Sequence, residues 1–172
     1  MNIPIEKLNV GPGVANDPSN SNSQTKAGEE LIERLGEELH EPLTKKKMNI
    51  PGTECPLELD GVSDNKMVYA EAYARVGELK PAQEQKVATD ILRLALVTRG
   101  KESETQRYLV FGDEEAANAV RGRKWLACAC EVLGVEVRVF EFSKEKREEL
   151  ENAQKGQARG AARKMSEREA GG

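Results

Sequence analysis

Two acidic residues, Asp60 and Glu71, lie on neighbouring segments that the sequence predicts to be the strands of a β-hairpin. Residues 61–66 between them hold Gly, Ser, Asp and Asn, which tolerate turn geometries, and the second strand is expected over residues 67–76. In a paired hairpin the two carboxylates can point to one side of the sheet. Converging carboxylates repel each other, so such a fold needs a cation, a shared proton or open water at this point.

The second strand has two unlike faces, because small apolar residues alternate with larger ones. One face carries an acid, two phenols and a guanidinium, whereas the small apolar face can take a closely packed helix. The first face holds Met67, Tyr69, Glu71, Tyr73 and Arg75, and the second holds Val68, Ala70, Ala72, Ala74 and Val76.

A purely structural interpretation of the two acids stays open at this point. Glu71 could pair with Arg75 or Lys80, and Asp60 could serve the turn at Gly61, since Asp-Gly is a common turn signal. Otherwise the two carboxylates form a site for a hard divalent cation, for which oxygen ligands favour Mg²⁺ or Mn²⁺ over zinc.

Hydrophobic periodicity predicts the elements that position these residues. Helices are expected over residues 25–40, from 81 to about 99, from 114 with a break near 122 and a continuation to 133, and from 144 onward. Besides the hairpin, strands are expected over 106–112 and 135–142, with a weak edge strand over 48–53. A hairpin followed by strand–helix–strand units implies an α/β fold with a mixed sheet and helices on both faces.

Composition limits the domain organisation and the class of protein. The chain has 172 residues, 33% of them charged, and a net charge of −4. We expect a disordered leader over residues 1–24, one α/β domain over 25–143, and a charged helix with a disordered tail over 144–172. No apolar run approaches the roughly 18–20 residues of a membrane span. Because the net charge is negative, nucleic acid binding would need local patches, such as Lys45–Lys47 or Arg121–Lys124.

The cysteines and the single histidine carry little chemistry. The chain has three cysteines, Cys55, Cys128 and Cys130, and no CxxC pair. Together with the lack of a secretory signal pattern, this predicts a cytoplasmic protein. Cys128 and Cys130 are expected to be buried structural thiols rather than zinc ligands. His40 is expected at the surface or at a helix end, and Trp125 as a core or half-buried anchor rather than a base-stacking platform.

The element order, with Asp60 at the end of one strand and Glu71 within the next, resembles the PD-(D/E)xK nuclease-like (restriction-endonuclease-like) superfamily. Its core runs α-β-β-β-α-β, and the resemblance covers about residues 25–142. The LDG…EAYAR…GxLK pattern also resembles small bacterial proteins of unassigned function. The resemblance implies that Asp60 and Glu71 bind a divalent metal. It also implies a lysine two residues after the second acid, where this chain has Tyr73.

The predicted function is therefore a Mg²⁺- or Mn²⁺-dependent phosphodiesterase, a hydrolase acting on nucleic acid with DNA favoured over RNA. Lys80 or Lys86 would replace the missing lysine beside Asp60 and Glu71. The residues expected to contact nucleic acid are Tyr73, Arg75 and Gln83. In some members of the family an acidic residue of the first helix also binds the metal. In this chain Glu30 or Glu37 could match that residue.

Two other functions remain open. One is a nuclease-like domain without catalysis, which would bind nucleic acid or a protein partner through its basic clusters. The other is a small-molecule-binding α/β domain, although the chain has no fingerprint loop for one. The resemblance further implies a homodimer or a part of a larger complex.

Overall fold

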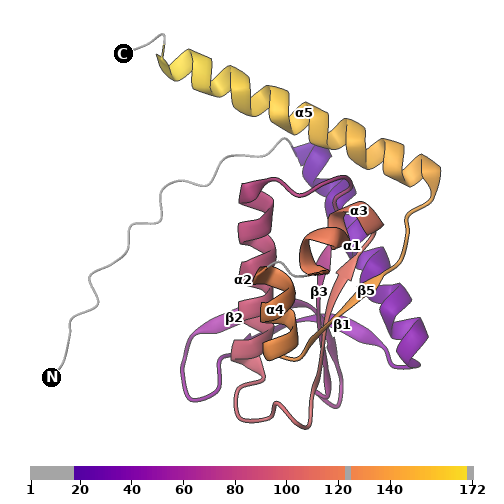
Figure 1. Cartoon of the computed structure of the whole chain (residues 1–172), viewed down its shortest axis with the longest axis vertical. Coiled ribbons are helices and arrows are strands. Elements are labelled where there is room, and N and C mark those ends of the chain that lie inside the picture. The colour runs from indigo at the N-terminus through magenta and orange to yellow at the C-terminus, as the bar shows by residue number, and fades with distance from the viewer. Residues whose placement is uncertain (1–17, 123–124, 170–172) are drawn as a thin grey trace, which may run out of the picture.

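The computed structural model describes residues 18–122 and 125–169, and Figure 1 shows their arrangement. Residues 1–17 of the expected leader lie outside the described residues. The first six elements are α1 (Pro18–Leu39), β1 (Leu43–Asn49), β2 (Pro56–Ser63), β3 (Val68–Tyr73), α2 (Pro81–Val97) and β4 (Gln106–Phe111). They are followed by α3 (Glu114–Ala117), the 3₁₀ turn η1 (Asn118–Val120), α4 (Trp125–Val132), β5 (Val135–Val139) and α5 (Lys144–Glu169).

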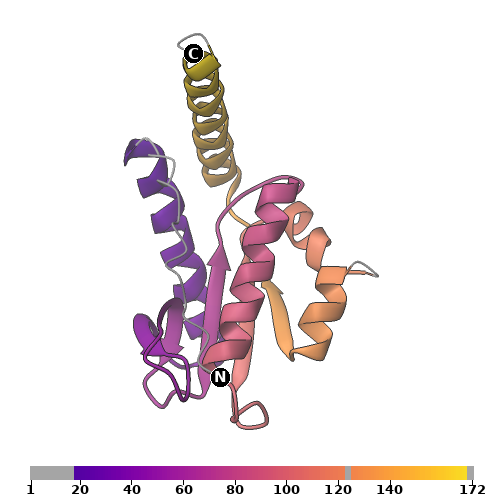
Figure 2. The same cartoon turned by 90° about the vertical axis from the view of Figure 1, so that its left-hand side faces the viewer.

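The five strands form one mixed sheet in the order β1-β2-β3-β4-β5. The pairs β1–β2 and β2–β3 are antiparallel, whereas β3–β4 and β4–β5 are parallel. Figure 2 shows α1 on one side of the sheet and α2 with α4 on the other. The predicted mixed α/β sheet with helices on both faces is confirmed. Among the described helices, none combines the length and the apolar character that crossing a membrane requires.

The sheet separates two hydrophobic cores, and the two faces of β3 belong to different ones. Tyr69 and Tyr73 pack in the core under α2 and α4, whereas Val68 and Ala70 pack in the core under α1. This division follows the alternation of large and small residues along the strand. Small residues on the α1 side let that helix approach closely, as Gly61 shows: a Cβ there would lie 3.0 Å from Ile32.

The N-terminal elements differ from the predictions in two places. The first helix begins at Pro18 rather than residue 25, with a proline at a position that helix starts favour. The edge strand β1 spans Leu43–Asn49, so Lys45–Lys47 lie on a strand and not in a loop. Lys45 pairs with Glu58 (3.0 Å) and Lys46 with Asp64 (2.9 Å). These ion pairs neutralise most of the predicted basic cluster.

Two predictions about burial were wrong. The Trp125 side chain is 61% exposed, so it is not a core anchor. Cys128 is also exposed, whereas Cys130 is buried as expected. The helical period of the short helix α4 explains the difference, since Leu126 and Cys130 take the inward positions.

The C-terminal helix α5 continues through Glu169, although composition predicted a disordered end. Its Ala, Arg, Lys and Glu residues favour helix, which outweighs the two glycines within it. Leu150 and Ala153 are buried against the body of the protein. Arg147 forms an ion pair with Asp113, the residue that caps α3.

Candidate functional site

A β-bulge places Asp60 at the point where two strands separate. Thr44 pairs with Val62 and Lys46 with Leu59, so two residues of β2, Asp60 and Gly61, stand opposite one of β1. Beyond the β2–β3 pair Gly61–Ala70, the Ala72 N–H donates to the Asp60 carboxylate (3.0 Å to Oδ2) instead of to a strand carbonyl. The bulge therefore turns the Asp60 side chain into the gap between β2 and β3.

Glu71 meets Asp60 from β3 and is almost fully buried, with 1% of its surface exposed. Burial, the charge of Asp60 and a hydrogen bond between the two carboxyls together raise the pKa of Glu71 to about 9. At neutral pH this raised pKa favours a Glu71 carboxyl that keeps its proton beside Asp60. Of the three ways to tolerate converging carboxylates, the protein thus uses a proton, together with the nearby cation Arg93.

Three charged residues of α2 complete the cluster. Asp90 is buried, and its carboxylate accepts from Lys86 (2.6 Å, Oδ2 to Nζ). The Arg93 Nη1 atom lies 3.5 Å from Asp90 Oδ1 and 3.1 Å from Glu71 Oε1. Burial raises the pKa of Asp90, and the charges of Lys86 and Arg93 oppose that shift.

The contact between Arg93 and Glu71 is close but poorly aligned. Its distance is that of an ion pair, yet Glu71 Oε1 has no hydrogen-bond partner among residues 18–122 and 125–169. The guanidinium is instead engaged with Asp90 and with the Glu58 carbonyl. Arg93 is therefore a neighbouring cation of Glu71, whose raised pKa favours the neutral carboxyl.

A groove of about 1160 Å³ opens next to this cluster, between α1, β1 and the end of β3. Asp60, Tyr73, Arg75 and Lys86 line it, whereas Glu71 lies behind them. One wall is acidic, with Glu29, Glu33, Glu37 and Glu41, and the cations Lys45, Arg75 and Lys86 face the same groove. Asp60 is the residue that connects the groove to the buried carboxyl.

The other predicted site residues are placed as follows. Lys80 is exposed, does not line the groove and precedes α2, where its N–H donates to Gln83 Oε1 (2.8 Å). Gln83 is therefore engaged in capping the helix. Tyr73 is buried, and in the part of the chain that the structure describes its hydroxyl has no hydrogen-bond partner. Arg75 donates to Gln157 of α5 (3.3 Å). Of the two first-helix acids considered, Glu37 lines the groove and Glu30 does not.

Sequence reasoning missed Asp90 and Arg93 as members of the site. The signal was available, because Lys86, Asp90 and Arg93 recur at i, i+4 and i+7 and so share one face of α2. Charged residues on a helix face that packs against a sheet point to a buried polar cluster. Without the strand bulge, however, the sequence does not show which acids meet them.

The cluster fits a hard cation only in part. Within residues 18–122 and 125–169, no three His, Cys, Asp or Glu side chains are grouped so that they could hold a metal ion. Asp60 and Glu71 together offer two carboxylates, and Mg²⁺ is often bound by one or two carboxylates with water and substrate oxygens. Glu71 Oε1, which makes no hydrogen bond to the described residues, is an oxygen ligand that such an ion could use.

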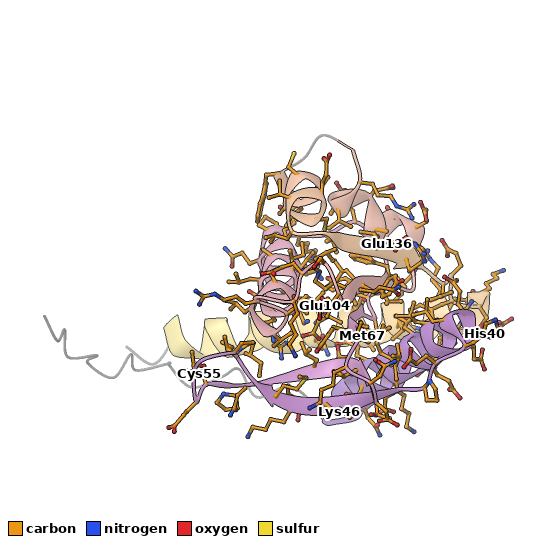
Figure 3. All side chains as sticks on the ribbon, turned by 90° about the horizontal axis from the view of Figure 1, so that it is seen from below. His40, Lys46, Cys55, Met67, Glu104 and Glu136 are labelled. Atoms are coloured by element: carbon orange, nitrogen blue, oxygen red, sulfur yellow. The ribbon has the colours of Figure 1, made fainter. Side chains whose placement is uncertain are left out.

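His40 and Cys55 lie too far apart along the sheet to bind one metal ion together. Figure 3 shows His40 and Cys55 at opposite ends of the β1–β2 hairpin, in agreement with the strand register.

Comparison of the chain with family models, with curated proteins and with solved structures gave no match.

Proposed function

We propose that the protein is a divalent-metal-dependent phosphodiesterase acting on nucleic acid, built on a restriction-endonuclease-like α-β-β-β-α-β core. One observation carries the proposal: Asp60 and Glu71 converge from adjacent strands beside a groove that Lys86 also lines. The order of the first six elements, α-β-β-β-α-β, supports it.

Asp60 and Glu71 would hold Mg²⁺ or Mn²⁺ once Glu71 gives up its proton. The bound ion would activate water and stabilise the charge that develops on a phosphate. Lys86 is the lysine of the pair Lys80 and Lys86 that faces the groove, where its ammonium can contact a phosphate oxygen. Asp90 holds that ammonium in place through an ion pair of 2.6 Å.

The charge of the groove restricts how nucleic acid can enter. The four glutamates on the α1 side repel phosphate, so the strand would have to follow the opposite side, with Arg75 and Lys86. A bound divalent ion would reverse the local charge around Asp60. Binding of nucleic acid should therefore depend on the metal as strongly as cleavage does.

A second candidate function is a non-catalytic domain that binds nucleic acid or a protein partner. Two observations favour it: a buried tyrosine, Tyr73, stands where the family has its lysine, and Arg93 already places a positive charge at Glu71. Such a domain would bind its partner without cleaving it.

The test is a cleavage and mobility-shift assay on labelled single-stranded DNA, duplex DNA and RNA, with Mg²⁺, Mn²⁺ or EDTA. We expect metal-dependent cleavage that Asp60→Asn abolishes, that Lys86→Met slows by about 100-fold, and that Lys80→Met leaves intact. Metal-dependent binding without cleavage would support the second candidate instead. If no substrate is cleaved or bound under any condition, both nucleic acid proposals fail.

A further inference from the structure

We propose that the Arg93 guanidinium is the positive charge that neighbours the Asp60–Glu71 carboxyl pair, and that a bound divalent ion displaces it from its place beside Glu71. This inference rests on the proposed function, because it concerns the same metal site. It assigns to Arg93 a positioning role: the residue closes the site until metal enters.

The contacts of Arg93 place its charge between three elements. Nη1 lies 3.1 Å from Glu71 Oε1 on β3 and 3.5 Å from Asp90 Oδ1 on its own helix. Nη2 donates to the backbone carbonyl of Glu58 on β2. The guanidinium therefore spans the gap between β2 and β3 on the α2 side, and Asp60 reaches the same gap from the groove.

Arg93 has a route out of this position. Its side chain is 27% exposed, whereas those of Glu71 and Asp90 are 1% and 2% exposed, so the arginine can reach solvent and the acids cannot. Among the described residues its contact with Glu71 Oε1 is not an aligned hydrogen bond, so the bonds that it would give up are those to Asp90 and to the Glu58 carbonyl. Lys86 remains to neutralise Asp90 after the arginine has moved.

The positions of the charges determine whether Arg93 strengthens or weakens metal binding. A divalent ion that binds Glu71 within a few ångströms of a guanidinium is repelled by it, and this repulsion is strong where the surroundings are buried. Removing the charge of Arg93 should therefore tighten metal binding by about tenfold or more. If Arg93 only supported the fold, its replacement would weaken metal binding, because Asp60 and Glu71 would be held less firmly.

The experiment is calorimetric titration of Mn²⁺ into the full chain and into Arg93→Gln, Arg93→Lys and Arg99→Gln. Arg99 is an exposed arginine just beyond α2 and serves as the matched control. We expect tighter binding only in Arg93→Gln, with Arg93→Lys close to the parent because it keeps the charge. Arg93→Met, which keeps the aliphatic stem, is the second uncharged variant if Arg93→Gln does not fold.

The outcomes separate this inference from the proposed function. If the parent binds Mn²⁺ and Arg93→Gln binds it with equal or lower affinity, the role of Arg93 is overturned but the metal site is not. Binding seen only in the uncharged variants supports the role of Arg93 in its strongest form. No binding by the parent or by either uncharged variant overturns both.

Discussion

Replacing Glu71 with Gln should make the protein more stable at alkaline pH. In the folded protein the Glu71 carboxyl is buried at 1% exposure beside Asp60, and its pKa is raised to about 9 from an ordinary value of 4.5. A neutral glutamic acid and a glutamine have nearly the same shape and can both donate a hydrogen bond to Asp60. At pH 5 the substitution should therefore change the free energy of unfolding little.

The size of the effect follows from the difference in proton binding between the two states. Between about pH 5 and 9 the folded protein keeps the Glu71 proton, and the unfolded chain has lost it. Stability falls as pH rises wherever the folded state binds more protons, by at most about 1.4 kcal/mol per pH unit for one group. From pH 6 to pH 8 this contribution amounts to about 2.7 kcal/mol, which Glu71→Gln should remove.

The assay is urea unfolding of the parent and of Glu71→Gln at pH 6, 7 and 8. Every other titrating group contributes equally to both proteins, so the difference between their slopes isolates Glu71. Glu33→Gln, an exposed groove glutamate, is the matched control and should keep the slope of the parent. Equal slopes in the parent and in Glu71→Gln, or a variant several kcal/mol less stable at every pH, would refute the shared proton. In that case Glu71 would be ionised and paired with Arg93, since breaking a buried pair costs roughly 3–5 kcal/mol.

Three further predictions follow from the same cluster and from the packing around it. Mn²⁺ affinity should rise about tenfold per pH unit between pH 6 and 8, because one proton leaves Glu71 for each ion bound. Calorimetry in buffers of different ionisation enthalpy counts the released proton, and an affinity that does not change with pH would contradict the prediction. Lys86→Met should lower the cleavage rate about 100-fold while Lys80→Met does not, as single-turnover assays can show, and equal losses would remove Lys86 from its role. Gly112→Ala should destabilise the fold by roughly 1–3 kcal/mol or more, because the added Cβ would overlap the Phe142 ring; an unchanged melting temperature would show that the ring can move.

Much of the scaffold could be predicted from the sequence, because the strands carry strong patterns. The alternation of β3 assigned Tyr69 and Ala70 to opposite faces, and the structure buries them in different cores. Pro81 begins α2 and Gly134 takes a positive φ of 60°, as turn and cap chemistry predict. β1 was harder to predict, since an edge strand rich in lysine has no clear apolar period.

The site was only partly predictable, for a physical reason. Asp60 and Glu71 were found because strand pairing brings them together, but the bulge that turns Asp60 depends on the register with β1. The role of Arg93 depends on where α2 crosses the sheet, which the sequence of the helix alone does not fix. Burial of Glu71, which sets its protonation, is likewise a property of the packed structure.

The most direct test of the proposed metal site is calorimetric titration of Mn²⁺ at pH 8 into the parent protein, Asp60→Asn and Glu71→Gln. We predict one bound ion per chain in the parent and none in either variant, with both variants folded as judged by circular dichroism. Absence of binding in the parent, or binding that survives both substitutions, would contradict a metal site at the Asp60–Glu71 pair.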